Sequence, residues 1–351
     1  MKKYFVFSTS DHIGYITSQF IQGAKLYGAE VTTNLSRPDC DGRFMKADIQ
    51  SLGLRFREQP SDDEEIIIDE TRMLSSFEDL GEGFLNTLCS RSDSERIRLI
   101  YGNDDANFIT FPSGISCYVP HQIRGFRKAL SVHPIPWGVT LECIEEGLKG
   151  TNTTRLLGTI IQNFNSTNNQ SVRESLLAAL QGYNFRSLKL DERHLQGHEY
   201  AEQLRSRQFS MAFGGLFFWP RSDYEYMRTC MSENSLKLDV FPQRDRKVGV
   251  LRWDSFRFWE TMAFGCVPIQ LDFDIYGFLF PETPIGWQHY VPIDLMRIGD
   301  TFDRLESMVF NDSAKIEEMS FHGRSWCLEN AHPIKTFMHI TGISQVRVEA
   351  L

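Results

Sequence analysis

The stretch VGVLRWDSFRFWETMAFGCVPI, residues 248–269, decides how the C-terminal half of the chain folds. Asp254 or Ser255 is a good N-cap, and the residues after them carry apolar side chains at helical spacing as far as Phe264. Gly265 suits the left-handed position that follows a helix, and the apolar run beyond it has the length of a buried strand. This stretch therefore predicts a loop, a helix, a tight turn and a strand.

Strands and helices alternate in the same way near the start of the chain. Residues 4–8 predict a strand, residues 15–27 a helix and residues 30–33 a second strand, which is a β-α-β beginning. Two further apolar strands, at 66–70 and 97–101, end in polar residues. Mostly apolar strands with polar carboxyl ends are typical of a doubly wound parallel sheet.

A segment of linker composition at 145–154 separates two such series. After it we expect strands at 156–162, 185–190, 209–213 and 267–271, and helices at 171–181, 200–207 and 314–330. Because both halves repeat the same alternation, the expected fold is α/β, with two Rossmann-like domains facing a cleft. Residues 1–147 form the first domain, residues 148–330 the second, and residues 331–351 a last segment able to cross back to the first.

Length and charge narrow the classes of function. The 351 residues exceed what one hydrophobic core usually supports, in agreement with two domains. A formal net charge of -9 argues against broad contact with nucleic acid or anionic lipid, since both need a dense cationic surface. The lysines at the N-terminus precede an apolar run too short for a signal peptide or a membrane span. We therefore expect a cytoplasmic protein without a membrane span, leaving room for peripheral membrane contact.

The helix that begins after Ser255 carries two charged residues suited to a nucleotide. Arg257 lies in the first turn, where free backbone N–H groups and the helix dipole already favour an anion such as a diphosphate. Glu260 follows one turn deeper on the same face, where its carboxylate can accept hydrogen bonds from both hydroxyls of a ribose. Together these residues describe a clamp for a nucleotide sugar.

The plainer alternative is that Arg257 and Glu260 form an ordinary surface ion pair, since residues three apart on a helix often do. The flanking side chains count against it. Phe256, Phe258 and Trp259 predict a largely buried helix, on which unpaired charges are costly unless a ligand or partner occupies them.

The pattern Ser255-x-Arg257-x-x-Glu260, followed by GCVPI at 265–269, resembles the donor-binding signature of exostosin-type glycosyltransferases of the GT-B fold. The resemblance covers residues 195–300. It implies an enzyme that moves a sugar from a nucleotide donor, most simply a UDP- or GDP-sugar, to a hydroxyl acceptor. The acceptor class stays open between a glycan, a lipid-linked saccharide and a small molecule, and no metal cofactor is expected.

Upstream, the segment from Tyr200 to Gly214 and Gly215 is similar to the family's region before its glycine-bearing nucleotide loop. Two features depart from the family. Its eukaryotic members carry a membrane anchor that this sequence lacks, and Asp254 with the aromatic run 256–259 is unusual for it. The identities of donor and acceptor therefore do not transfer.

Other cations near the clamp extend the candidate donor site. Arg246 and Lys247 precede the helix and are suited to wrapping phosphates, although a solvated surface loop explains them equally well. Arg252 stands eight positions before Glu260, where a second group of GT-B enzymes, which retain the anomeric configuration, has a second glutamate. Its presence favours an inverting reaction. The candidate donor residues are Ser255, Arg257, Glu260, Asp254, Arg252, Gly214, Arg246 and Lys247.

An inverting transfer needs a base to take the acceptor's proton, and GT-B enzymes hold it in the first domain. His12 and Asp11, in the loop after the first strand, are the leading candidates, because plant-type GT-B enzymes place a catalytic histidine in the corresponding loop. In those enzymes an aspartate after a later strand orients the histidine, a part that Asp104 or Asp105 could play. The remaining alternatives for the base are Asp69, Asp104 and His121.

Two motifs stay outside this assignment. Asp272 and Asp274 match the D-x-D pattern that holds a metal in other glycosyltransferases, but they follow a strand of the second domain, so we discount a metal site there. Trp287, His289 and Tyr290 either border the sugar pocket or pack in the core.

Two alternatives to glycosyl transfer remain open, together with a further acceptor for it. Enzymes that epimerise or hydrolyse sugar nucleotides also use GT-B domains with a nucleotide clamp. A non-catalytic nucleotide-sugar-binding protein would keep the clamp without a base. Glycosylation of DNA is a further alternative, which the acidic composition makes less favourable.

Overall fold

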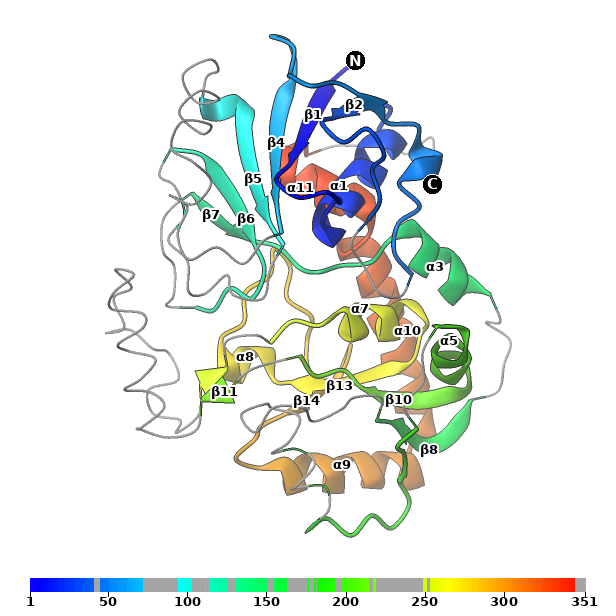
Figure 1. Cartoon of the computed structure of the whole chain (residues 1–351). Helices are drawn as coiled ribbons and strands as arrows, with labels where there is room; N and C mark the ends of the chain where they lie inside the picture. Colours follow the sequence, from blue (N-terminus) through cyan, green and yellow to red (C-terminus); the bar gives the residue numbers. More distant parts are fainter. Residues whose placement is uncertain are drawn as a thin grey trace. The chain divides into compact units, whose positions relative to one another are not determined.

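The computed structural model of the chain describes residues 1–40, 45–71, 94–102, 111, 114–124, 131–149, 155–162, 176, 180, 182–193, 197–214, 217–218, 249–250 and 253–344. These residues form two compact units (Figure 1). Unit 1 contains the described chain up to Glu142 and again from His332, and unit 2 contains the described chain from Cys143 to Ala331.

Unit 1 is built on a parallel sheet of seven strands in the order β3-β2-β1-β4-β5-β6-β7. Its strands and helices are β1 Lys3–Ser8, α1 Tyr15–Leu26, β2 Glu30–Thr33, the 3₁₀ turn η1 Gln50–Leu52, β3 Arg55–Phe56, β4 Glu65–Glu70, η3 Ser94–Arg96, β5 Ile97–Tyr101, β6 Ser116–Val119, β7 Val132–Pro134 and α11 Pro333–Thr341. The strand order reverses between β1 and β4, the position where ligands bind beyond the carboxyl ends of such sheets.

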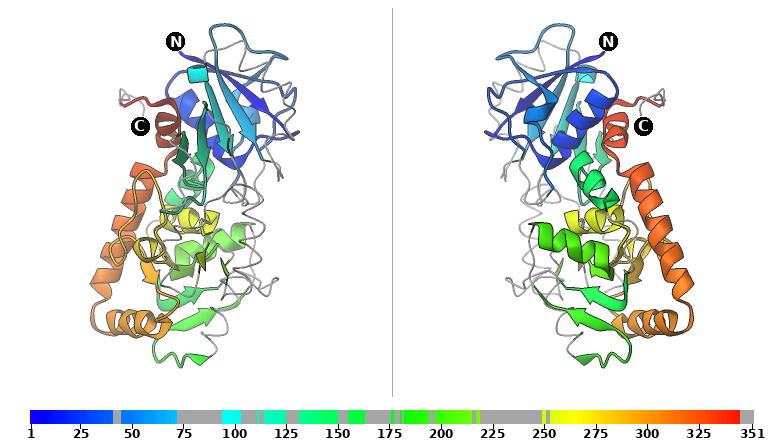
Figure 2. Two further views of the ribbon diagram at one scale, coloured as in Figure 1. Left: turned by 90° about the vertical axis from the view of Figure 1, so that its left-hand side faces the viewer. Right: turned by 90° about the vertical axis from the view of Figure 1, so that its right-hand side faces the viewer.

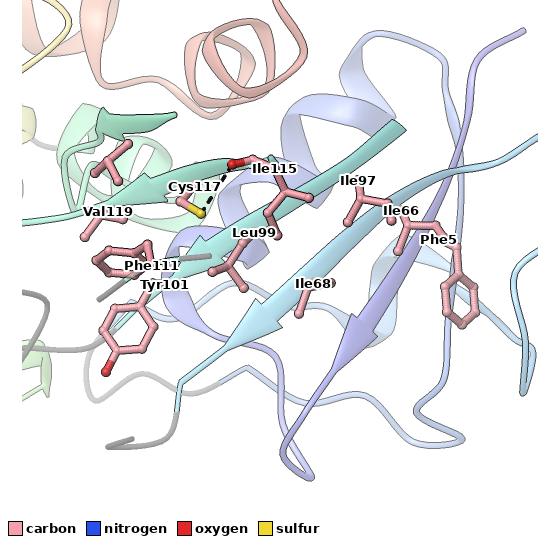
Figure 3. Close-up of a cluster of buried hydrophobic side chains, with 11 residues drawn as sticks. Phe5, Ile66, Ile68, Ile97, Leu99, Tyr101, Phe111, Ile115, Cys117 and Val119 are labelled. Atoms are coloured by element: carbon pink, nitrogen blue, oxygen red, sulfur yellow. Dashed lines mark hydrogen bonds between the residues drawn. The ribbon is translucent and has the colours of Figure 1, made fainter. Parts of the chain in front are cut away.

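Alternate residues of these strands form one core (Figure 3). Ile66 and Ile68 of β4 lie beside Ile97 and Leu99 of β5, and all four are at most 2% exposed. The apolar strand pattern thus positions the polar residues that follow β1 and β4 at one edge of the sheet.

Helix α11 packs beside α1 in unit 1, as both views of Figure 2 show. A Cβ at Gly23 of α1 would lie 2.2 Å from the carbonyl oxygen of Pro333, so only glycine permits this approach. Tyr118 donates a hydrogen bond of 2.8 Å to the carbonyl oxygen of Ile340, which ties α11 to β6 as well. Helix α11, which follows residue 331, is thus an integral part of unit 1.

Unit 2 is built on a second parallel sheet, in the order β14-β13-β10-β8-β9. Its elements are β8 Leu156–Ile161, β9 Lys189–Asp191, α5 Gly197–Ser206, β10 Arg207–Met211, β11 Phe217–Phe218, β12 Gly249–Val250, α7 Phe256–Ala263, β13 Val267–Leu271, α8 Phe273–Tyr276, β14 Val291–Ile293, α9 Ile298–Asn311 and α10 Ser313–Asn330. Helix α3, Leu141–Leu148, crosses the division between the units. The predicted fold class, α/β with two Rossmann-like sheets, is confirmed.

Two local predictions are wrong. The strand expected at 185–190 is only β9, because the carboxylate of Glu306 accepts hydrogen bonds from the backbone N–H groups of Arg186, Ser187 and Leu188, which are then unavailable to a sheet. The expected linker begins later than predicted, since α3 continues to Leu148. The helix expected at 171–181 lies mostly outside the described residues.

No helix within the described ranges is long and apolar enough to cross a membrane.

Candidate functional site

The N-terminus of α7 lies against the chain that leaves β10. A Cβ at Gly214 would come within 2.4 Å of the carbonyl oxygen of Asp254, so the two backbones meet only because residue 214 is glycine. Ser255 is the N-cap predicted from the sequence, with extended backbone (φ -149°, ψ 135°) and a side chain that accepts a 3.3 Å hydrogen bond from the backbone N–H of Arg257. The start of α7 is therefore held at the carboxyl end of β10.

Asp254 fixes the start of α7 from the other side. Its Oδ1 accepts a hydrogen bond of 2.8 Å from the backbone N–H of Ser255 and one of 2.7 Å from the indole N–H of Trp259. The side chain is nearly buried, and this oxygen is aimed at the protein. Asp254 was predicted to contact the donor. Its two hydrogen bonds to Ser255 and Trp259 show that it positions the start of the helix.

A cluster of aromatic rings packs around the buried side of α7. Trp253 stacks on Phe278 with ring centroids 4.3 Å apart and planes inclined by 4°. Phe258 contacts the ring of Phe273 at 5.2 Å, and Trp259 stacks on Trp326 of α10 at 5.8 Å. The polar end of α7 therefore stands on a rigid apolar base, the preorganisation that a binding site needs.

Arg257 and Glu260 do not form the ion pair that the plainer interpretation requires. Their side chains are not within 4 Å of each other as a salt bridge, and in the described part of the chain neither makes a side-chain hydrogen bond. Glu260 is nonetheless only 4% exposed. Burial raises the pKa of its carboxyl to about 7, against the lowering effect of the nearby Arg257 charge. A buried carboxylate left without a partner is costly, and such a group marks a binding site.

The structure describes some of the other predicted donor residues and not the rest. Gly214 and Ser255 join Arg257 and Glu260 around the start of α7. Arg252, Arg246 and Lys247 lie outside the described residues, as do Asp104 and Asp105.

Gly214→Ala tests whether the close approach to Asp254 holds the start of α7 in place. Because the added methyl group meets a backbone carbonyl rather than a flexible side chain, we expect a loss of about 1–3 kcal/mol in unfolding free energy. Gly299→Ala, where a Cβ meets nothing within 4 Å, is the matched control and should not destabilise the protein. Chemical denaturation measures both, and equal stability of the two variants would contradict the assignment.

In unit 1, His12 lies at the β1/β4 switch point with a carboxylate on one ring nitrogen. Nδ1 is 3.0 Å from Oδ1 of Asp11, and Nε2 is 3.5 Å from Oγ1 of Thr71, which follows β4. The side chain of Asp11 is 98% exposed, whereas that of His12 is 35% exposed. Ser8 and Ser10 donate hydrogen bonds of 2.6 and 2.9 Å to the carbonyl oxygen of His12, which fix the loop. The predicted base is therefore a partly exposed imidazole whose ring contacts Asp11 and Thr71. Among the described residues, Asp11 supplies the carboxylate beside it.

Asp69, an alternative base, serves the fold of unit 1. It is fully buried at the end of β4, where it accepts hydrogen bonds from the backbone N–H of Gly14 at 2.8 Å and from the hydroxyl of Thr17 at 2.6 Å. Gly14 has no side chain to cap α1, so Asp69 supplies the cap from another strand. Burial raises its pKa to about 6, although both hydrogen bonds oppose this. Its oxygens already face α1, so it does not present a base to a substrate.

The other alternative base, His121, is also buried. It is 1% exposed and packs edge-on against Trp137, with ring centroids 6.0 Å apart. A side chain so enclosed does not reach an acceptor hydroxyl without local opening.

The two motifs set aside in the sequence have structural roles. Asp272 caps α8 by accepting hydrogen bonds from the backbone N–H groups of Asp274 and Ile275, each at 3.0 Å. His289 Nδ1 accepts the N–H of Ile285 at 2.8 Å, and burial lowers its pKa to about 4. Tyr290 is 1% exposed and stacks on Phe273, so the side chains of His289 and Tyr290 pack in the core. Among the described residues no cluster of three or more potential metal-binding side chains occurs.

Sequence reasoning missed two residues near these groups. Thr71 directly follows the strand 65–70 and faces His12, a position that the rule for carboxyl ends of parallel strands could have indicated. Tyr200 was noted in the sequence only within the predicted helix and the resemblance. It is buried, and the charges of Glu260 and Arg257 shift the pKa of its hydroxyl in opposite directions. Nothing in a single tyrosine on an amphipathic helix signals such a neighbour in advance.

No protein-family model matches the sequence. No curated protein matches it either. Among solved structures, the chain is similar to an alpha-glucosyltransferase in complex with UDP-glucose and DNA containing an abasic site, with 11% identity, 95% of each chain covered and a TM-score of 0.46. It is also similar to a glycosyltransferase from Rickettsia africae ESF-5, with 9% identity, 98% of each chain covered and a TM-score of 0.47. A third is WaaG, a glycosyltransferase involved in lipopolysaccharide biosynthesis, with 10% identity, 96% of this chain and 100% of that chain covered and a TM-score of 0.39. Likeness at this level carries no conclusion about what this chain does.

Proposed function

We propose that this protein is a glycosyltransferase that moves a sugar from a nucleotide donor to a hydroxyl acceptor, with unit 2 binding the donor. The observation that carries the proposal is Glu260, a carboxylate that is 4% exposed and has no hydrogen-bonding partner in the described part of the chain. It lies one turn below Arg257, at a helix start whose backbone N–H groups favour an anion.

Arg257 and Glu260 would bind different parts of the donor. The guanidinium of Arg257 and the first backbone N–H groups of α7 would bind the diphosphate, while Glu260 would accept hydrogen bonds from the two ribose hydroxyls. The hydrogen bonds from ribose supply the partners that a buried carboxylate needs to stay ionised. This pairing fits a nucleoside diphosphate better than an inorganic anion, because an anion alone gives Glu260 nothing to accept.

The finer assignments belong to the same proposal. His12, oriented by Asp11, takes the proton of the acceptor hydroxyl as the oxygen attacks the anomeric carbon and the nucleoside diphosphate leaves from the opposite face. Attack of this kind inverts the anomeric configuration. The resemblance to exostosin-type enzymes supports the donor half alone. UDP and GDP are the first nucleotides to test, a carbohydrate is the first acceptor, and no metal is required.

The donor half is tested by melting the full chain with UDP, GDP, dTDP, CMP and their sugars. We expect one nucleoside diphosphate to raise the melting temperature of the wild type, because a ligand that binds only the folded state stabilises it. Arg257→Met should abolish the rise. Arg297→Met removes an exposed arginine of the same unit and is the matched control.

Failure of every nucleotide to stabilise the wild type, or an equal response of Arg257→Met and Arg297→Met, would overturn the donor assignment. Incubation of the selected nucleotide sugar without an acceptor separates transfer from epimerisation or hydrolysis, since only the latter two change the donor by themselves.

A further inference from the structure

Thr71 lies beside the proposed base, at the point where the strand order of unit 1 reverses. Strands β1 and β4 pair in parallel, so the loop after β1, with His12, and Thr71, directly after β4, meet at one edge of the sheet (Figure 1). The hydroxyl oxygen of Thr71 is 3.5 Å from Nε2 of His12. Both side chains are partly exposed, so solvent and substrate can reach the space beside them.

Two glycines fix the orientation of Thr71. A Cβ at Gly14 would lie 2.5 Å from the methyl carbon of Thr71, and a Cβ at Gly102 would lie 3.8 Å from it, so the methyl group packs against both glycines. Threonine is branched at Cβ, so a fixed methyl group also fixes the direction of the hydroxyl. That hydroxyl points to Oγ of Ser10, 3.2 Å away, and to the ring of His12.

The nitrogen of His12 that faces this hydroxyl is the basic one. Nδ1 lies 3.0 Å from Oδ1 of Asp11, and the hydrogen bond with His12 lowers the pKa of that carboxyl. An ionised carboxylate only accepts hydrogen bonds, so Nδ1 carries the ring hydrogen. Nε2, beside Thr71, therefore has the lone pair that takes a proton.

We propose that Thr71 binds the reacting hydroxyl of the acceptor together with His12, and that it selects oxygen over nitrogen as the attacking atom. The proposal rests on the proposed function, because it concerns the acceptor of the same transfer. An acceptor oxygen about 2.8 Å from both Nε2 and the Thr71 oxygen makes a hydrogen bond of ordinary length to each.

A hydroxyl has the right number of hydrogens and lone pairs for this place. Its one hydrogen points to Nε2 of His12, and one of its two lone pairs accepts the hydrogen of the Thr71 hydroxyl, which rotates to reach it. The other lone pair forms the bond to the anomeric carbon as the bond from that carbon to the nucleoside diphosphate breaks. The proton of the acceptor hydroxyl passes to Nε2. Thr71 thus holds the oxygen in the direction of attack.

An amine does not meet the same conditions. Its neutral nitrogen has a single lone pair, which must form the new bond and cannot accept a hydrogen bond from Thr71 at the same time. Thr71 therefore assists attack by an alcohol and gives no help to an amine in the same position. The chemical class that fits this site is an alcohol, such as a sugar hydroxyl.

Thr71→Val tests this role, because valine keeps a methyl group against Gly14 and replaces only the hydroxyl. The acceptors are methyl glycosides and, for the one with the highest rate, the analogue with an amino group in place of the reacting hydroxyl. Both are measured at about pH 9, where most of the amine is neutral, as release of UDP or GDP from its sugar. We expect kcat/KM to fall about tenfold for the alcohol, as for loss of one hydrogen bond, and to stay unchanged for the amine.

Thr9→Val is the matched control, since it removes a threonine hydroxyl that donates to the carbonyl oxygen of Asp69 at 3.1 Å instead. It should leave the ratio of alcohol to amine rates at the wild-type value. Thr71→Ser keeps a hydroxyl at this position and should recover most of the alcohol rate. The rise in melting temperature with UDP or GDP should be the same in all three variants.

Equal losses of Thr71→Val on the alcohol and the amine, or no recovery of the alcohol rate in Thr71→Ser, would show that Thr71 only supports the fold. An alcohol rate of Thr71→Val equal to that of the wild type would overturn its role alone. A wild type that transfers sugar to no acceptor overturns the proposed function, and the role of Thr71 with it.

Discussion

Replacement of Glu260 by glutamine is expected to make the ligand-free protein more stable at pH 8 while weakening nucleotide binding at least tenfold. A pKa raised from 4.5 to about 7 means that folding opposes ionisation by about 3 kcal/mol. Glutamine has almost the same shape and carries no charge to bury, so the protein regains about 2–3 kcal/mol above pH 7. Binding weakens because hydrogen bonds to a charged oxygen are worth about 1.5–3 kcal/mol.

The sign of this effect changes with pH in a defined way. Since the folded-state pKa of Glu260 is raised, its favourable contribution is fully present below about pH 4.5 and is lost as the pH rises through 7. Wild type and variant should therefore be almost equally stable at pH 4.5 and should diverge between pH 5 and pH 8. Urea denaturation at a series of pH values measures this difference.

Glu306→Gln is the matched control, because it changes another buried glutamate of unit 2. The pKa of Glu306 is lowered, whereas that of Glu260 is raised. Burial favours the neutral form of Glu306, but backbone N–H groups of residues 186–188 donate to its carboxylate and lower its pKa. This variant should lose stability at pH 8. If Glu260→Gln also loses stability there, Glu260 has partners in the folded protein and is not held for a ligand.

His12→Ala should reduce the rate of transfer about 10²–10⁴-fold, the usual contribution of a general base. Binding of the nucleoside diphosphate should be unchanged, because both residues of the proposed clamp, Arg257 and Glu260, lie in unit 2. Turnover is followed as release of nucleoside diphosphate from the nucleotide sugar that the melting screen selects, with the best acceptor found. Asp11→Asn keeps the imidazole and removes the carboxylate 3.0 Å from its Nδ1, so its loss should be smaller.

His133→Ala is the control for loss of a histidine in unit 1. Transfer at the wild-type rate by both His12→Ala and Asp11→Asn would remove this loop from the mechanism. Parallel losses of nucleotide affinity in these variants would instead show that the loop contributes to the donor site.

Features that depend on neighbouring residues could be predicted from the sequence. Ser255 is followed by a helical apolar pattern and Gly265 by a strand, and the structure has the cap, the helix and a left-handed Gly265 (φ 67°) in those places. The strands β1, β4, β5 and β13 were recognisable for the same reason, since apolar runs bounded by polar loops are local signals.

Features that depend on residues far apart in the chain could not be predicted from the sequence. The loop 185–188 reads as a strand until Glu306, about 120 positions away, takes its backbone N–H groups. Asp69 looked like a candidate base because its sequence position is polar, and only the fold reveals that it caps α1 at Gly14. The isolation of Glu260 is likewise a property of packing: the apolar flanks of the helix predict burial, but they do not reveal which groups lie beside the carboxylate.

The return of α11 to α1 has a consequence for synthesis on the ribosome. The close contact of Gly23 with Pro333 joins residues more than 300 positions apart, so the side of α1 that contacts α11 stays uncovered while all of unit 2 is made. Unit 2 closes its sheet with β14 before α11 emerges. The unit that is begun first is therefore the one finished last, and nascent chains released before residue 341 would expose the apolar side of α1 to chaperones and proteases.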